Sequence, residues 1–445
     1  MKIKGKNVLE SFLGNPDDKL RNAVISNPYC NPCSMMRKSM SVLLMTTLSF
    51  VMFLIHAQDI TTIDITTAKF GEIVADEIFD EIKFIPLETH PDGLLNITTT
   101  TYYLTDKYIL AITFLRILTG SSRAYLFDRE TGAFIKQVSS YGQGPDEFTG
   151  WLCDRYGFDA KNNVIFASDG QLIGGSCKGF NIETNKVGII VKKPLHENAR
   201  QQIVVSTPWL LKDNMYVSFV NNITGKDKVK LIIYDKEGTV IKRYPNYLEY
   251  KKEENARSMP DFDGIFYYYN GNTYFKEFSY NDTIFCVDEK NLTPHIVFNL
   301  GNKQPSYYHQ NDSRYNIEKY LIQFVYESNS FVLFSFTYPT ETMKDPFLGG
   351  TMTKSASRHT GYYDKKTKQA YISSTADYKK TGYVVSGLPV NFFPISVNTN
   401  NEVVSHINPE ELMQYKDKID PKYNHLFQNI QEDDNPVVII AKLKN

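Results

Sequence analysis

A hairpin pattern that recurs at a nearly constant spacing constrains the fold of this chain more than any other feature. An apolar strand ends in an acidic residue, a polar turn follows, and a second apolar strand begins, as in AYLFDRETGAFI and LIIYDKEGTVI. Five such units, aligned on their acidic residue, are separated by 55, 52, 53 and 76 residues. The aligned residues are Asp128, Glu183, Asp235, Asp288 and Asp364. A period of roughly 50 residues with several short strands per unit is typical of a β-propeller blade.

The length of the chain sets the number of blades. Residues 58–445, divided by the observed spacing, give six or seven blades, and we expect six. Five hairpins are visible, so the sixth blade must combine strands from both ends: ITTIDIT and EIKFIPLE (60–66 and 81–88) with NPVVIIAKL (435–443). Joining the terminal strands in one blade leaves no open sheet edge. We therefore predict an all-β fold, a six-bladed β-propeller over residues 58–445 that is closed by N- and C-terminal strands.

Two stretches depart from the repeat. The last spacing is long because of an insertion near Thr337–His359, which is rich in Gly, Thr, Ser and Pro and is predicted to be a surface loop. The segment Asn408–Ile419 is predicted to be a helix on one face, because Asn408 can cap it and Pro409 suits its first position.

The stretch YGQGPDEF (141–148) cannot be a helix or a central strand, because Gly142, Gly144 and Pro145 interrupt it. We interpret it as the corner between the last strand of one blade and the first strand of the next. Its glycines are expected to adopt unusual backbone dihedral angles, and Phe148 is expected to enter the core.

The GQGPDEF corner and the following GFDAKNNVIFASD resemble the NHL-type repeat. More closely, they resemble the bacterial exported six-bladed β-propeller family (NHL/TolB-like), whose blades carry a GxGPxEF/Y corner. Further stretches that resemble this family, from FIPLET to NPVVIIAKLK, span nearly all of residues 80–444. The resemblance implies the propeller fold and export to the periplasm or cell exterior of a Gram-negative bacterium, but it does not name a ligand.

Four residues at and beyond the corner are the candidate binding residues: Asp146, Glu147, Trp151 and Arg155. The two acids can face a ligand at the mouth of the ring, and Trp151 and Arg155 combine a large aromatic ring with a forked cation near its rim. The run FYYY (266–269) has two interpretations. Its alternate residues can pack between blades, or they can form a stacking platform for a sugar or a peptide.

No catalytic motif is present. The chain lacks a G-x-S-x-G elbow, a phosphate-binding loop and an H-E-x-x-H motif, and its histidines lack metal-ligand spacing. We therefore expect no catalytic residue, metal or cofactor, and a non-catalytic binding or interaction scaffold for a peptide, protein or glycan. The alternative is a metal-dependent lyase or hydrolase with a site in the central channel, as in some NHL-type propellers.

Residues 36–57 carry the pattern of a secretory signal peptide. Arg37 and Lys38 precede the apolar run Val42–Ile55, and Ala57 precedes polar residues. We expect cleavage after Ala57 and no stable membrane span afterwards, since a span needs roughly 20 apolar residues. An uncleaved membrane anchor is the alternative.

Residues 1–35 form an upstream extension. The segment 12–36 contains Cys30-x-x-Cys33 and resembles the opening of a thioredoxin-like domain with an NPxCxPC active site. The remainder of that fold is missing, so we expect no folded domain and no redox function here.

Charge and cysteine content limit the partners. With 49 basic and 50 acidic residues the net charge is −1, which does not indicate a nucleic-acid ligand. Cys153, Cys177 and Cys286 follow the signal segment and are predicted to be small buried hydrophobic residues, with a Cys153–Cys177 bridge as an open possibility. We expect a monomer.

Overall fold

In a computed structural model of the chain, the described elements belong to one unit, Ile60–Asn445. The structure describes residues 60–96, 98–116, 121–138, 140–148, 158–159, 162–168, 175–194, 206–212, 214–222, 224–252, 264–277, 279–344, 351–374, 381–428 and 430–444. The signal segment, its cleavage point and the thioredoxin-like segment lie outside these residues. None of the helices in the described part is long and apolar enough to cross a membrane.

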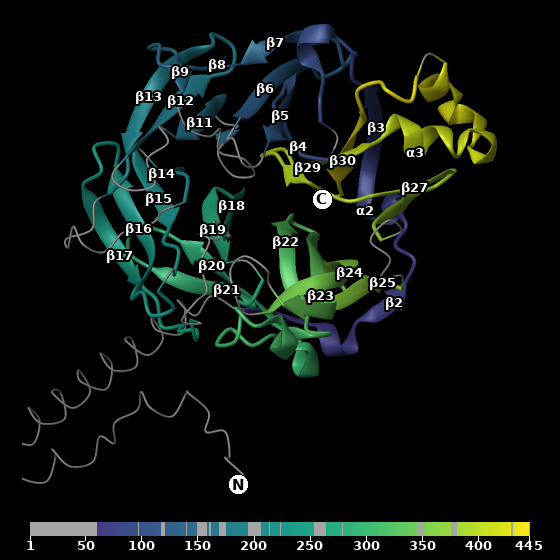
Figure 1. The fold of residues 1–445 in the computed structure, drawn as a ribbon. Helices are drawn as coiled ribbons and strands as arrows, with labels where there is room; N and C mark the ends of the chain where they lie inside the picture. Colours follow the sequence, from purple (N-terminus) through teal and green to yellow (C-terminus); the bar gives the residue numbers. More distant parts are fainter. Residues whose placement is uncertain are drawn as a thin grey trace, which may run out of the picture. The chain divides into compact units, whose positions relative to one another are not determined.

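The fold is all-β, as predicted. Eight sheets are present among the described residues, and six of them contain four or five strands. We number these six sheets in chain order (Figure 1). Sheet 1 contains β4 (Thr100–Leu104), β5 (Tyr108–Arg116), β6 (Ser121–Asp128) and β7 (Phe134–Val138); sheet 2 contains β10 (Phe158–Asp159), β11 (Val164–Ser168), β12 (Ser176–Asn181) and β13 (Lys186–Lys192); sheet 3 contains β14 (Trp209–Lys212), β15 (Met215–Phe219), β16 (Val229–Asp235) and β17 (Val240–Pro245).

Sheets 4 and 5 each gain a fifth strand from the start of the described chain. Sheet 6 combines three late strands with the early strand β3. Sheet 4 contains β18 (Gly264–Tyr269), β19 (Asn272–Glu277), β20 (Thr283–Val287), β21 (Leu292–Asn299) and β1 (Thr61–Asp64); sheet 5 contains β22 (Leu321–Glu327), β23 (Phe331–Lys344), β24 (Thr351–Asp364), β25 (Gln369–Ser373) and β2 (Lys69–Gly71); sheet 6 contains β28 (Ser396–Val397), β29 (Glu402–Ile407), β30 (Val437–Leu443) and β3 (Phe79–Pro86). The two small sheets are β8 (Ser140–Tyr141) with β9 (Glu147–Phe148), and β26 (Tyr383–Val385) with β27 (Leu388–Phe392).

The recurring hairpin of the sequence is the third and fourth strand of sheets 1 to 5. In four of these hairpins the aligned aspartate accepts hydrogen bonds from two backbone N–H groups of the turn that follows. In sheet 2 Asn181 has this role, because its Oδ1 accepts from the N–H groups of Glu183 and Thr184. The predicted alignment on Glu183 is therefore two residues late, and with Asn181 the first three separations become 53, 54 and 53 residues.

Apolar side chains fill the space between neighbouring sheets. Separate clusters join sheets 1 and 2, 2 and 3, 3 and 4, 4 and 5, and 5 and 6, and a further cluster joins sheet 6 to sheet 1. In β18, Phe266 belongs to the cluster shared with sheet 3, whereas Tyr267 belongs to the one shared with sheet 5. The FYYY run thus supplies packing residues on both faces, as alternation along a strand requires. Cys177 and Cys286 are also buried, as predicted, while Cys153 lies outside the described residues.

The last strand of the chain, β30, pairs with the early strand β3 in sheet 6. Strand β30 lies between β29 and β3, with Phe84 paired to Ile439 in antiparallel register. The predicted partnership of EIKFIPLE and NPVVIIAKL is confirmed. The assignment of ITTIDIT to the same sheet is wrong: β1 pairs in parallel with β21 of sheet 4, where Ile63 is fully buried.

The predicted surface loop at Thr337–His359 is also wrong in its described parts. Residues 337–344 belong to β23 and residues 351–359 to β24, and Met343 pairs with Met352, while residues 345–350 lie outside the described residues. Exposure alternates along the first half of β24, because every second side chain faces solvent. Threonine and serine suit such a strand as well as they suit a loop.

The predicted helix at Asn408–Ile419 is present but shorter. Helix α3 spans Pro409–Met413, and Asn408 occupies its N-cap position without a side-chain hydrogen bond to the helix. The other short helices are α2 (Ala75–Ile78), η3 (Ile65–Thr67), η4 (Pro91–Gly93), η5 (Gly301–Lys303), η6 (Ser313–Asn316), η7 (Lys416–Lys418) and η8 (Pro421–Phe427).

Candidate binding surface

The connections between strands differ in length at the two ends of the sheets. Turns between first and second strands, and between third and fourth strands, contain two to five residues, as at 213–214 and 129–133. Connections from the last strand of one sheet to the first strand of the next are much longer, as at 193–208, 246–263 and 300–320. Because antiparallel strands alternate in direction, these longer connections all leave the same end of the sheets, here called the long-connection end. Binding residues concentrate on such segments, which makes this end the natural place for a site.

The predicted corner GQGPDEF lies in the long connection between β7 and β10, where Asp146 contacts the start of β13. Oε2 of Glu147 accepts a hydrogen bond from the Gly144 N–H at 2.7 Å, and Oδ1 of Asp146 accepts one from the Val187 N–H at 3.0 Å. A Cβ atom on Gly142 would lie 2.0 Å from the Glu147 carboxylate. Neither Gly142 nor Gly144 has a positive φ, so the expected unusual dihedral angles are wrong. The close approach of Glu147 is what requires a glycine at position 142.

The structure describes only two of the four candidate binding residues. Asp146 and Glu147 are engaged by backbone groups of the corner and of β13, which gives both acids a structural role. Trp151 and Arg155 lie outside the described residues. A contact of any of the four with a ligand stays a prediction. Phe148 is buried against Phe180 of the next sheet, as expected.

A second long connection, residues 300–320 between β21 and β22, presents exposed aromatic rings. Tyr308 and Tyr315 are 53% and 54% exposed. The rings of His309 and Tyr315 are stacked, with centroids 3.9 Å apart and planes inclined by 10°, and the Tyr308 ring meets His309 edge-on at 5.0 Å. We call Tyr308, His309 and Tyr315 the aromatic platform.

Polar side chains within the segment fix the shape of the platform. Asn316 is fully buried; its Oδ1 accepts from the Ser306 N–H at 2.8 Å, and its Nδ2 donates to the His309 carbonyl at 3.3 Å. Asp312 accepts from the Arg314 guanidinium through Nε at 2.8 Å and Nη2 at 2.5 Å. The hydrogen bond from Arg314 lowers the pKa of Asp312, which keeps the carboxylate ionised.

A buried charged cluster anchors the platform to sheets 3 and 4. The Tyr307 hydroxyl donates to Oε1 of Glu277 at 2.9 Å. Glu277 is 6% exposed, and it also forms an ion pair with buried Lys230 and accepts from Asn281 Nδ2 at 2.9 Å. Burial opposes ionisation of Glu277, but the Lys230 charge and the hydrogen bonds from Lys230, Asn281 and Tyr307 together outweigh it and lower the pKa. Outside this cluster, the Tyr280 hydroxyl donates a hydrogen bond to the Gln310 carbonyl at 3.1 Å.

Another lysine, Lys276, is buried beside this cluster. Its Nζ donates to the backbone carbonyls of Glu277 and Asn281. Burial lowers the pKa of the amine to about 7, although the carboxylates of Glu277 and Asp282 act in the opposite direction. With 1% exposure the side chain cannot contact a ligand, so it supports the connection between β19 and β20.

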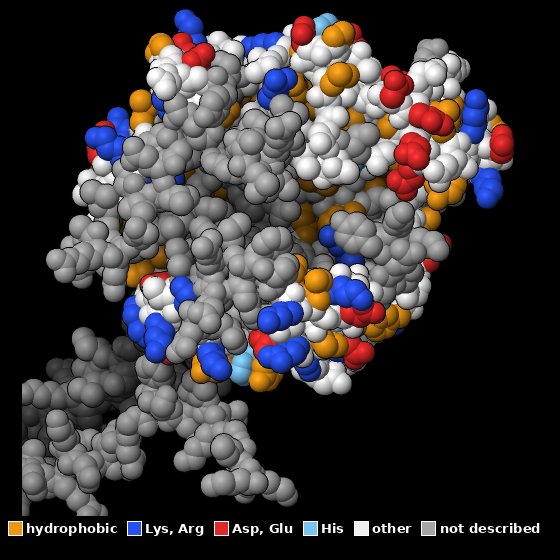
Figure 2. Space-filling model, in the orientation of Figure 1, with side chains coloured by type: hydrophobic (Ala, Val, Ile, Leu, Met, Phe, Trp, Pro, Cys, Tyr) orange, Lys and Arg blue, Asp and Glu red, His pale blue; other side chains and the backbone are white. Residues whose placement is uncertain are grey.

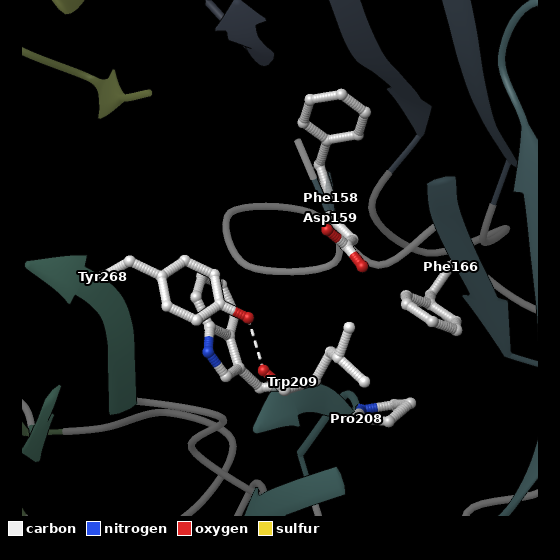
Figure 3. A pocket seen from close by; sticks show the side chains of 7 residues that line it. Phe158, Asp159, Phe166, Pro208, Trp209 and Tyr268 are labelled. Atoms are coloured by element: carbon white, nitrogen blue, oxygen red, sulfur yellow. Dashed lines mark hydrogen bonds between the residues drawn. The ribbon is translucent and has the colours of Figure 1, made fainter. Parts of the chain in front are cut away.

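A small hollow lies between the first strands of sheets 2, 3 and 4 (Figure 3). The Tyr268 hydroxyl donates to the Leu210 carbonyl, and the Tyr268 and Trp209 rings lie 4.8 Å apart. Nε1 of Trp209 is buried without a partner among the described residues. The hollow, of about 10 Å³, has room for about one water molecule and not for an organic ligand. Its walls are Phe158, Asp159, Phe166, Pro208, Trp209, Leu210 and Tyr268.

Histidine and carboxylate side chains meet as pairs rather than as clusters. Nε2 of His295 lies 2.7 Å from Oε2 of Glu327, whose other oxygen accepts from Lys365 Nζ at 2.5 Å. Glu327 is 2% exposed, so the neighbouring Lys365 compensates a buried charge between sheets 4 and 5. The described part of the chain contains no group of three or more His, Cys, Asp or Glu side chains able to hold a metal ion.

Comparison with known proteins assigns a family. A family model described as a domain of unknown function, DUF4934, matches residues 60–442, from the first strand of the described unit to the last. The chain belongs to the DUF4934 family. No curated protein matches it.

Two solved structures resemble this DUF4934 chain. A "putative exported protein" of Bacteroides fragilis NCTC 9343 has a TM-score of 0.59 at 18% identity, and the match covers 86% of this chain and 100% of that one. A member of the DUF4221 family from Bacteroides vulgatus ATCC 8482 has a TM-score of 0.51 at 11% identity, with 82% and 99% covered. At these identities the likeness concerns the fold alone.

The aromatic platform of the DUF4934 chain was not among the residues predicted from sequence. Its stretch, SYYHQNDSRY (306–315), places three aromatic residues and a histidine among turn-forming polar residues between two strands. Aromatic residues in a long polar connection are not part of a strand or helix that would bury them. Their presence there indicates an exposed aromatic surface, and this pattern could have identified the platform from the sequence.

Proposed function

We propose that the six large sheets are the blades of a six-bladed β-propeller. Three observations support this architecture: sheets 1 to 5 each contain four antiparallel strands that are consecutive in sequence, apolar clusters lie between all neighbouring sheets including the last and the first, and strands β3 and β30 pair to complete sheet 6. A closed array of this kind hides sheet edges that would otherwise pair with other chains.

The protein is exported and works in the periplasm or at the cell exterior of a Gram-negative bacterium. The basic residues, apolar run and small residue of segment 36–57 support export. The B. fragilis protein of similar fold is itself named as an exported protein, which agrees with this proposal.

Its function is that of a non-catalytic scaffold that binds a peptide, protein or glycan at the long-connection end. The observation that carries this function is the aromatic platform, whose rings are exposed although Asn316, Asp312 and the buried Glu277 cluster hold their segment in place. A fixed aromatic surface loses little conformational freedom on binding, so more of the contact energy is available for affinity.

Removal of the platform rings tests this function. The variant carrying Tyr308→Ala and Tyr315→Ala should keep the unfolding free energy within about 0.5 kcal/mol, since both side chains are exposed. It should lose capture of ligands that the wild-type protein selects from a glycan array and a random peptide library.

The matched control is Ile190→Ala on β13, where an apolar side chain is 50% exposed away from the platform. This control should capture the same ligands as the wild type. Unchanged capture by the double variant would move the site elsewhere, with Trp151 and Arg155 as the next residues to substitute.

A further inference from the structure

Exposed lysines lie directly beside the aromatic platform. The backbone N–H of Lys251 donates to the Tyr308 carbonyl at 2.9 Å, so this stretch of the preceding long connection runs alongside the rings. Lys251 and Lys252 are exposed, and neither forms an ion pair with an acidic side chain of the described chain. The acid that precedes them, Glu249, is paired with Lys228. Both lysine side chains therefore reach solvent on the stretch that runs alongside Tyr308.

The platform carries a further cation on its own segment. The Arg314 side chain is 65% exposed and is oriented by Asp312, next to Tyr315 in the chain. Figure 2 shows Lys and Arg side chains gathered along the lower edge of the visible face, where Figure 1 draws β20, β21 and β23, while Asp and Glu side chains gather over α3. In a chain with a net charge of −1 this is a local concentration of positive charge.

The shape of the surface distinguishes between ligand classes. The His309 and Tyr315 rings stack face to face and so cover one face of each other, which leaves the opposite face of Tyr315 and the exposed Tyr308 ring for a ligand. The hollow between sheets 2, 3 and 4 is too small for a side chain. Peptide and protein partners usually insert an anchor residue into a pocket. A flat ring face with a polar rim instead suits a ligand that is itself a chain of rings, apolar on one face and hydroxylated at its edge.

We propose that this surface binds an acidic polysaccharide, in which uronate rings stack on Tyr308 and Tyr315 while their carboxylates pair with Lys251 and Lys252. This proposal rests on the binding function above and names its ligand class. The aromatic rings supply most of the contact area, and the lysines supply the preference for a charged polymer.

Affinity electrophoresis and calorimetry with defined polymers test the ligand class. The probes are polygalacturonate, alginate and hyaluronate as acidic polymers, and fully methyl-esterified polygalacturonate as a matched polymer that keeps the rings without the charge. Wild-type protein should bind at least one acidic polymer. When that polymer is polygalacturonate, the esterified form should bind about tenfold more weakly, and binding to any of the three should weaken as salt is raised from 50 to 500 mM.

Two variants separate charge from stacking. Lys251→Gln together with Lys252→Gln should weaken binding of the acidic polymer about five- to tenfold and remove most of its salt dependence. Tyr308→Ala together with Tyr315→Ala should abolish binding of every polymer. The control Lys192→Gln removes an exposed lysine on β13, far along the chain from the platform. It should leave the affinities for the acidic and the esterified polymer unchanged.

The outcomes distinguish this proposal from the binding function on which it rests. Equal affinity for charged and esterified polygalacturonate would overturn the acidic class and leave a glycan-binding platform. Binding of no polymer, with peptide ligands that are lost in the tyrosine variant, would overturn the glycan class and leave the binding function. If oligo(dT) bound more tightly than every polysaccharide, and both the lysine and the tyrosine variants lost this binding, the surface would be assigned to single-stranded nucleic acid instead. No ligand of any class at the platform would overturn both.

Discussion

A glycine is required at position 142 of the GQGPDEF corner because the carboxylate of Glu147 lies close to it, not because of its backbone angles. The carboxylate accepts the Gly144 N–H at 2.7 Å, and a Cβ atom on Gly142 would lie 2.0 Å from it. Gly142→Ala should therefore displace Glu147 and destabilise the protein by about 1–2 kcal/mol, because a hydrogen bond to a charged group is lost. Urea unfolding of the purified protein measures this change.

A double-mutant cycle identifies the cause. In a Glu147→Ala background the same Gly142→Ala change should cost less than about 0.5 kcal/mol, because nothing remains for the new Cβ atom to displace. Gly188→Ala, at a position with no atom within 4 Å of the added Cβ, is the matched control. Additive costs in the cycle would mean that the glycine is required for another reason.

At the scale of single residues, the sequence predicted which residues turn the chain but not what holds them there. The corner was recognisable because Gly and Pro restrict the possible backbone conformations. The contact between Gly142 and Glu147 depends on a side-chain rotamer, which no spacing rule specifies. The platform residues Tyr308 and Tyr315 were missed for a related reason, since their exposure is decided by Asn316 and Glu277, and Glu277 is distant in sequence.

At the scale of elements, local hairpins were predictable and long-range partners were not. All five hairpins exist because a polar turn with a capping Asp or Asn joins two apolar strands, and this information is contained in about twelve residues. The strand ITTIDIT was assigned to the wrong sheet because pairing partners more than 200 residues apart leave no local pattern. The insertion at 337–359 has a composition that predicts a loop, because Thr and Ser suit both a loop and an exposed hairpin.

The packing of β29 against β4, which joins sheet 6 to sheet 1, contains a group that should respond to pH. The His406 ring lies 5.3 Å from the Tyr102 ring, and its Nδ1 is buried without a partner among the described residues. Burial lowers the pKa of His406 to about 4. Between that value and the ordinary pKa of 6.5, the unfolded chain binds a proton that the folded chain does not, so stability falls as pH drops.

His406→Leu should therefore flatten the acid side of the stability profile. Wild-type protein should lose about 2 kcal/mol from this group between pH 7.5 and pH 5, and the variant should lack that part of the loss. Urea unfolding at the two pH values measures it. Tyr102→Phe, which changes the same interface without removing a group that titrates in this range, should keep the wild-type slope. An unaltered slope in His406→Leu would show that His406 is accessible to protons in the folded state.

At the scale of the whole molecule, the last strand completes a sheet with β3, one of the first three strands. β30 lies between β29 and β3, and its side chains enter two clusters, one shared with sheet 5 and one shared with sheet 1. Sheets 1 to 3 are built from consecutive strands alone, and sheets 4 and 5 each have four consecutive strands before β1 or β2 is added, so the four-stranded part of each can form locally. Sheet 6 forms only when the last strand of the chain reaches β3, and the proposed ring closes only at that step.

A truncation after Asn435 tests the closure directly. It removes β30, whose buried Val, Ile, Ala and Leu side chains stabilise the fold by an amount on the order of 10 kcal/mol, comparable to the stability of a whole domain. It also exposes the edges of β29 and β3, which can then pair with other chains. The truncated protein should aggregate, as measured by light scattering after size-exclusion chromatography, while removal of residues 444–445 alone should leave a folded monomer. A peptide of residues 436–445 added during refolding should restore part of the monomer, because it can occupy the vacant strand position. A truncated protein that stays monomeric and unfolds cooperatively would mean that β30 does not close the array.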